Sequence, residues 1–183
     1  MAILQEDMEL LLQFKNEATK ERAFTAILKK YQEKLYWHIR RMVVGHEDAN
    51  DVLQNMFVKA WKGLENFRED SQLYTWLYRI ATNESLTFLE QQKRRSTVSM
   101  SDEDTGLSNK VKADSNFDGN KLEWKLQLAI QQLPEKQKAV FNLRYFEEMP
   151  YNEMSTVLET SEGALKASYH HAVKKIEDYI LNN

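Results

Sequence analysis

Apolar residues recur every three or four positions along most of this chain, which is the spacing of amphipathic helices. The clearest run spans residues 49–61, where apolar side chains stand at i, i+3, i+4, i+7 and i+8: Ala49, Val52, Leu53, Met56, Phe57, Ala60 and Trp61. A second stripe lies within residues 20–42: Phe24, Ile27, Leu28, Tyr31, Leu35, Ile39 and Met42. Only 5 Gly and 2 Pro interrupt the 183 residues. The pattern therefore predicts an all-α protein.

Helix start and stop signals divide the pattern into elements. In the first half, Gly45 and Gly63 end helices and Ser71 is a predicted N-cap; the expected helices span about 6–14, 20–42, 46–62 and 72–93. In the second half, helices are expected over about 122–132, from Leu133-Pro134 to about 145, over 150–158, and over 162–180 after Ser161. A short helix, the turn Glu159-Thr160 and a capped amphipathic helix form the helix-turn-helix arrangement.

Residues 96–120 break the periodicity and carry 5 Asp/Glu against 2 Lys/Arg. Polar, Ser- and Asp-rich segments of this kind are typical of linkers. The sequence thus predicts two helical domains, residues 1–95 and 121–183, joined by a flexible acidic linker. The whole chain has a net charge of -3. Since non-specific DNA affinity scales with the phosphates neutralised, such a chain would need a larger partner to hold DNA.

Catalytic and metal sites are not indicated. There is no Cys, no Gly-rich phosphate loop and no nucleophile elbow, and the adjacent His170 and His171 point about 100° apart on a helix. We expect no enzymatic activity, no cofactor, no metal and no small-molecule substrate. The N-terminal segment is acidic where a signal peptide would be basic, and no apolar run exceeds four residues. These features favour a cytoplasmic protein without membrane insertion.

Two helices have faces whose role the pattern leaves open. The helix from Ser71 has a predicted polar face of Tyr74, Tyr78, Arg79, Thr82, Asn83 and Ser85, which suits either solvent or the bases and phosphates of a single strand. Residues 161–175 carry Lys166, Lys174 and Lys175 against Glu162, a local charge of +2. Small and hydrogen-bonding residues at that helix N-terminus suit the major groove, although a solvated interaction face would look similar.

Several strings in the chain resemble a known family. EDANDVLQNMFVKAW from Glu47, Phe67, TWLYRIATN from Thr75 and KRR from Lys93 resemble region two of the sigma-70 family. Leu133-Pro134-Glu135, FNLRYFEEMPYNEMSTVL and SEGALKASYHHAVKKI resemble its region four. The absence of other regions between them makes the chain most similar to the small extracytoplasmic-function (ECF) class. The chain departs from the family pattern where His170 and His171 replace frequent basic residues and where Pro150 replaces a capping Ser or Thr.

The resemblance implies specific surfaces. The third helix would dock on the clamp helices of the largest subunit of core RNA polymerase through Asp51, Gln54 and Asn55. The unpaired -10 element of promoter DNA would be captured by the loop Phe67 to Gln72 together with Tyr74, Arg79, Asn83, Lys93, Arg94 and Arg95. The -35 element would be read by Arg144, Lys166, Ala167, His170, His171 and Lys174. Members of this class are often held by an anti-sigma protein, so the resemblance also implies such a partner for this chain.

The expected function is therefore that of a sigma factor that brings polymerase to specific promoters and promotes their melting. In the free chain, we expect that the linker lets the two domains fold together and mask their DNA surfaces. Two alternatives are a helix-turn-helix regulator that acts without polymerase and an all-helical protein-interaction scaffold. A gel-shift assay would separate the three. The regulator should bind DNA alone, the sigma factor chiefly in the presence of polymerase, and the scaffold not at all.

Overall fold

A computed structural model describes residues 2–98 and 121–183 and shows eight helices and no strand within them. The predicted all-α class is thereby confirmed. The predicted linker, 96–120, lies outside the described residues apart from its first three, which continue a helix. Among the described residues, none of the helices combines the length and the apolar character needed to cross a bilayer.

The first domain contains α1 (Ala2–Phe14), α2 (Lys20–Val43), α3 (His46–Leu64) and α4 (Leu73–Val98). Their apolar stripes meet in a core that includes Leu35, Ile39, Met56 and Leu77, all at most 1% exposed. Two predicted boundaries are wrong. Gly63 does not end α3, which continues to Leu64, and Ser71 does not cap α4, because the helix starts two residues later with Trp76 N donating to Gln72 O.

The second domain contains α6 (Lys121–Gln131), α7 (Glu135–Tyr145), α8 (Tyr151–Leu158) and α9 (Glu162–Asn182). Glu159 ends α8 in the left-handed conformation, with φ 50° and ψ 43°. Ser161 then caps α9, because its Oγ accepts from the backbone nitrogen of Ala164 at 3.3 Å. The predicted helix-turn-helix is therefore present as α8, the turn and α9. Pro150 precedes α8 without a side-chain cap.

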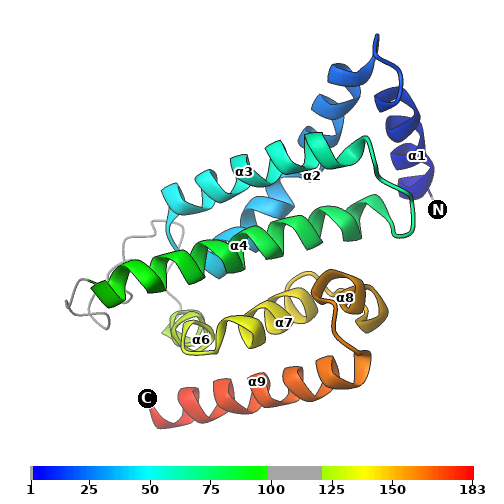
Figure 1. The fold of residues 1–183 in the computed structure, drawn as a ribbon. Helices are drawn as coiled ribbons and strands as arrows, with labels where there is room; N and C mark the ends of the chain where they lie inside the picture. The colour runs from blue at the N-terminus through cyan, green and yellow to red at the C-terminus, as the bar shows by residue number, and fades with distance from the viewer. Residues whose placement is uncertain (1, 99–120) are drawn as a thin grey trace.

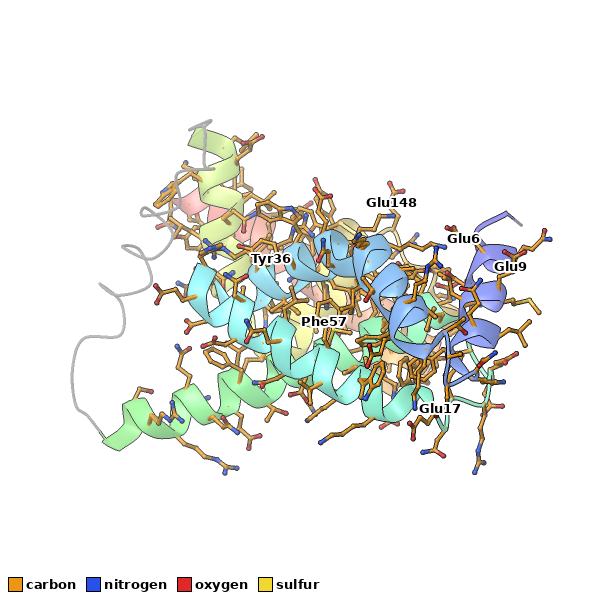
Figure 2. All side chains as sticks on the ribbon, turned by 90° about the horizontal axis from the view of Figure 1, so that it is seen from above. Glu6, Glu9, Glu17, Tyr36, Phe57 and Glu148 are labelled. Atoms are coloured by element: carbon orange, nitrogen blue, oxygen red, sulfur yellow. The ribbon has the colours of Figure 1, made fainter. Side chains whose placement is uncertain are left out.

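The two domains pack directly against each other. α4 contacts α7 and α8, and α2 contacts α7, while α9 covers the opposite side of α7 and α8 (Figure 1). One continuous cluster of buried residues includes Leu77, Tyr78 and Ala81 of α4 together with Met149, Met154 and Val157 of the second domain. Figure 2, seen from above, shows Tyr36 and Phe57 on the α2–α3 layer, which lies on the other side of α4. α4 is thus buried from two sides.

Candidate polymerase and nucleic-acid surfaces

The three predicted polymerase-binding residues lie together on α3. Asp51, Gln54 and Asn55 are spaced i, i+3 and i+4, so they share one helix face, and all three are exposed. The opposite face carries Val52, Met56 and Ala60, which are buried against α2 and α4. A helix with a fully packed inner face and a polar outer face is rigidly held and accessible to a partner.

Val58 is a residue of this surface that the sequence analysis missed. It stands three residues after Asn55 and four after Gln54, and it is 54% exposed. An apolar side chain that lies outside the core stripe of an amphipathic helix is the signal that could have identified it. Val58 adds an apolar centre to a face otherwise made of an acid and two amides.

The predicted -10 residues on α4 fall into three environments. Tyr74 is partly buried, with its ring 4.6 Å from that of Tyr78. Arg79 forms an ion pair with Glu159 at the end of α8. Asn83 is exposed one turn further along the helix. Tyr74 and Arg79 therefore lie next to the second domain, whereas Asn83 is exposed to solvent.

Lys93, Arg94 and Arg95 are exposed but lie far from this group. At 1.5 Å per residue, Arg94 is about 22 Å along the axis from Arg79. Arg94 also forms an ion pair with Glu90 at 2.6 Å within the helix. The structure thus places Tyr74 and Arg79 in the part of α4 next to the second domain and leaves the three basic residues at the opposite end of the helix.

Part of the predicted polar face of α4 is wrong. Tyr78, Thr82 and Ser85 were expected to face outward, but each is 0% exposed. Thr82 Oγ1 bonds to Nε2 of His38 at 2.9 Å, and Ser85 Oγ donates to the carbonyl oxygen of Ala81 at 2.8 Å. Tyr78 donates its hydroxyl hydrogen to Glu147 Oε2 at 2.7 Å. Their polar groups are satisfied inside the protein, which is how such side chains can lie in a core.

Burial and the nearby Glu147 carboxylate raise the pKa of both Tyr74 and Tyr78 above the ordinary value for tyrosine. For both hydroxyls, burial is the larger cause. The two phenols therefore stay protonated at neutral pH, and that of Tyr78 donates to Glu147.

The predicted -35 residues of α9 share one exposed face. All five are exposed: Lys166, Ala167, His170, His171 and Lys174. The buried side of the helix carries Leu165, Ala172 and Ile176. The His170 and His171 rings lie 6.1 Å apart, and the described part of the chain holds no group of three or more residues suited to binding a metal ion. The face predicted to read the -35 element is therefore accessible.

Arg144 is placed beside α9 by a tyrosine. Its Nη1 donates to the carbonyl oxygen of Met149 at 3.1 Å, and its guanidinium lies 5.0 Å from the centroid of the Tyr151 ring. The Lys166 ammonium lies 5.6 Å from the same ring. Tyr151 therefore positions two predicted -35 residues on different helices, at distances where cation–π attraction acts. Sequence analysis missed this role, because nothing local distinguishes Tyr151 from a core residue.

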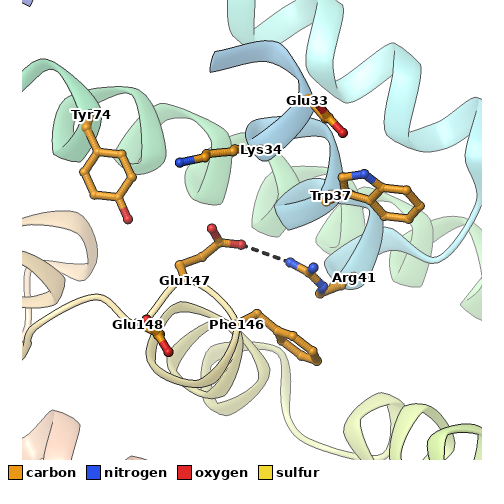
Figure 3. Close-up of a pocket in the computed structure, with 8 residues that line it drawn as sticks. All are labelled: Glu33, Lys34, Trp37, Arg41, Tyr74, Phe146, Glu147 and Glu148. Carbon is orange, nitrogen blue, oxygen red and sulfur yellow. Dashed lines mark hydrogen bonds and ion pairs between the residues drawn. The ribbon is translucent and has the colours of Figure 1, made fainter. Parts of the chain in front are cut away.

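A cavity of about 520 Å³ lies between the domains (Figure 3). Its lining comes from α2, α4 and the loop after α7: Glu33, Lys34, Trp37, Arg41, Tyr74, Phe146, Glu147 and Glu148. The Arg41 guanidinium lies 4.2 Å from the centroid of the Phe146 ring, and Arg41 Nη1 donates to Glu147 Oε1 at 3.0 Å. One wall of the cavity is therefore an interdomain contact.

Two family models match this chain, each over a different part of it. Residues 27–95 match the family model of Sigma-70 region 2, and residues 123–176 match that of Sigma-70, region 4. The chain is 34% identical over 165 residues to the RNA polymerase sigma-H factor of Pseudomonas aeruginosa, covering 86% of both chains. It is 30% identical over 168 residues to the ECF RNA polymerase sigma-E factor of Haemophilus influenzae, covering 87% of this chain and 88% of the relative.

Solved structures support the fold. The structure of CnrH in complex with the cytosolic domain of CnrY matches with a TM-score of 0.71 at 21% identity, covering 97% of this chain and 99% of that chain. The sigma factor RpoE of Bartonella quintana, solved with the anti-sigma factor NepR, matches with a TM-score of 0.68 at 18% identity, covering 86% and 96%. Both family models and the full-length relatives lead to one conclusion: the chain belongs to the sigma-70 family, as a sigma factor of the ECF class.

Proposed function

We propose that this sigma factor binds core RNA polymerase through the outer face of α3, with the clamp helices of the largest subunit as its docking site. The supporting observation is the exposed set of Asp51, Gln54 and Asn55 around Val58 on a helix whose inner face is fully packed. A polar rim around an apolar centre is the usual composition of a protein–protein contact. The relatives' names connect them to the same enzyme.

Promoter DNA is then read at two places. Tyr74, Arg79 and Asn83 of α4 and the loop before it capture the unpaired -10 strand, with stacking, phosphate pairing and base-edge hydrogen bonds respectively. The exposed face of α9, with Arg144 beside it, reads the -35 duplex. Lys93, Arg94 and Arg95 supply phosphate contacts further along the strand.

Binding alone accounts for this activity. The protein performs no covalent chemistry and needs no cofactor, because stabilising an extruded base offsets part of the cost of melting. It works in the cytoplasm with polymerase. An anti-sigma protein is a further expected partner, since the neighbouring RpoE structure contains a sigma factor bound to the anti-sigma factor NepR.

Two substitutions test the division of labour. Asp51→Arg is expected to lower affinity for core polymerase at least tenfold, because it reverses a charge within the docking face. Asn83→Ala is expected to keep polymerase affinity and to reduce promoter opening. Binding is measured by fluorescence anisotropy with purified core enzyme, and opening by permanganate reactivity and run-off transcription on genomic fragments.

Glu9→Arg is the matched control for Asp51→Arg. Glu9 is exposed on α1, at the end of the molecule shown in Figure 2, and the substitution makes the same change in charge. Normal polymerase binding by Asp51→Arg would contradict the docking assignment, and wild-type opening by Asn83→Ala would contradict the strand assignment. Sequence-specific DNA binding without polymerase would instead favour a stand-alone regulator.

A further inference from the structure

Arg41 and Glu147 form one closed wall of the interdomain cavity. Arg41 Nη1 donates to Glu147 Oε1 at 3.0 Å, and the Arg41 guanidinium lies 4.2 Å from the centroid of the Phe146 ring. The other carboxylate oxygen, Glu147 Oε2, accepts from the Tyr78 hydroxyl at 2.7 Å. Each charged group of this wall thus has a partner inside the protein, so the pair adds no net charge to the cavity.

Three further charged side chains line the cavity without a partner. Within residues 2–98 and 121–183, no side chain forms an ion pair or a hydrogen bond with Glu33, Lys34 or Glu148. All three are exposed, so the cavity opens to solvent and a small molecule can enter it. Two carboxylates and one ammonium remain, which gives the open part of the cavity a net charge of about -1 at neutral pH.

An indole ring lies beside one of the unpaired carboxylates. Glu33 and Trp37 are four residues apart on α2 and therefore share a helix face. A carboxylate next to an aromatic ring attracts organic cations, through ion pairing and through cation–π contact. Figure 3 shows the Lys34 ammonium directed away from this pair, toward Tyr74. The cavity therefore has a side suited to a cation and another side that carries a positive charge.

Tyr74 adds a hydrogen-bond donor to the positive side. Burial, and to a smaller extent the carboxylates of Glu147 and Glu153, raise the pKa of its phenol above the ordinary value, so the hydroxyl stays protonated at neutral pH. In the described part of the chain, this hydroxyl forms no hydrogen bond. An ammonium and a free hydroxyl on one side of a cavity are donors suited to a carboxylate.

We propose that this cavity binds a free basic amino acid of the L-lysine and L-arginine class. The carboxylate of the ligand meets Lys34 and Tyr74, and its two cationic groups meet the carboxylates of Glu33 and Glu148. The ligand carries two positive charges and one negative charge, which complement the unpaired charges of the cavity. A volume of about 520 Å³ at a domain interface is typical of small-molecule sites. The site requires neither polymerase nor DNA, so it does not rest on the proposed function.

Isothermal titration calorimetry on the full-length chain in 50 mM KCl tests the proposal. L-lysine and L-arginine are expected to bind with a Kd of about 0.1–1 mM, because contacts between exposed charges are individually weak. Cadaverine lacks only the carboxylate of L-lysine, and L-norleucine lacks only its terminal amine. Each analogue should bind at least about fivefold more weakly than L-lysine, because it leaves one side of the cavity unmatched.

A charge reversal at Lys34 tests the carboxylate contact separately. Lys34→Glu should reverse the preference, so that cadaverine binds more tightly than L-lysine. Lys29→Glu is the matched control, because Lys29 is exposed on the same helix outside the cavity lining and the change in charge is the same. This control should keep the order of affinities found in the parent, and circular dichroism checks that both variants retain their helices.

Three results would overturn the proposal. The first is that neither L-lysine nor L-arginine binds the parent at concentrations up to 20 mM. The second is equal affinity of the parent for L-lysine and cadaverine, which would mean that no group of the cavity recognises the carboxylate. The third is an unchanged preference in Lys34→Glu, which would place the bound amino acid elsewhere on the chain.

Discussion

His38 is a fully buried histidine on α2 that packs against α4. Its Nε2 bonds to Thr82 Oγ1 at 2.9 Å, and its ring lies 5.1 Å from that of Tyr78. Burial lowers the pKa of His38 to about 3, and the positive charge of Arg41 makes a smaller contribution in the same direction. The folded protein therefore holds this imidazole neutral, and His38 is part of the scaffold of α4.

This environment predicts a pH-dependent stability. Between pH 6.5 and 3, the unfolded chain takes up a proton at His38 that the folded chain does not. The free energy of unfolding then falls as pH falls, by roughly 1.4 kcal/mol per pH unit. From pH 7 to pH 5, the parent should lose about 2 kcal/mol more than His38→Gln, which keeps a polar partner for Thr82 but does not titrate. Urea unfolding at the two pH values measures this, and equal losses would contradict it.

At the scale of the element, α9 contains two neighbouring positions with opposite expected effects. Ser161 caps the helix, and a Cβ added at Gly163 would meet no atom within 4 Å. Ser161→Ala should lower the free energy of unfolding by about 1 kcal/mol, and Gly163→Ala should raise it by about 0.5–1 kcal/mol. Urea denaturation of the single variants tests both. A loss in Gly163→Ala would show that the glycine is needed by the folded helix.

Most helices could be predicted from periodicity and end signals, because these are local. The Ser161 cap and the stripe of α3 are examples, and both are confirmed. The outward face assigned to α4 was wrong for Tyr78, Thr82 and Ser85, because a helix buried from two sides has no single apolar stripe. Periodicity reports the faces of one helix but not what covers them. The exposed face of α3 was predictable for a related reason: α3 has only one buried side.

At the scale of the whole molecule, the docked arrangement combines apolar burial with ion pairs of unequal exposure. The Arg41 and Glu147 side chains are 25% and 11% exposed, whereas those of Arg79 and Glu159 are 40% and 71% exposed. Salt screens exposed pairs much more than partly buried ones. The buried cluster that spans both domains is not weakened by salt at all. The two contributions can therefore be separated by ionic strength.

We expect the free chain to stay compact as KCl is raised from 50 mM to 500 mM, because apolar packing and the buried Glu147 contact hold it. Small-angle scattering should give a radius of gyration close to the roughly 16 Å of a globule of this length at both concentrations. Glu159→Gln, which removes only the exposed pair, should match the parent in high salt. Glu147→Gln should have a larger radius of gyration than the parent at either KCl concentration. A parent that expands by several ångströms in 500 mM KCl would mean that exposed charges, not the buried contact, hold the domains together.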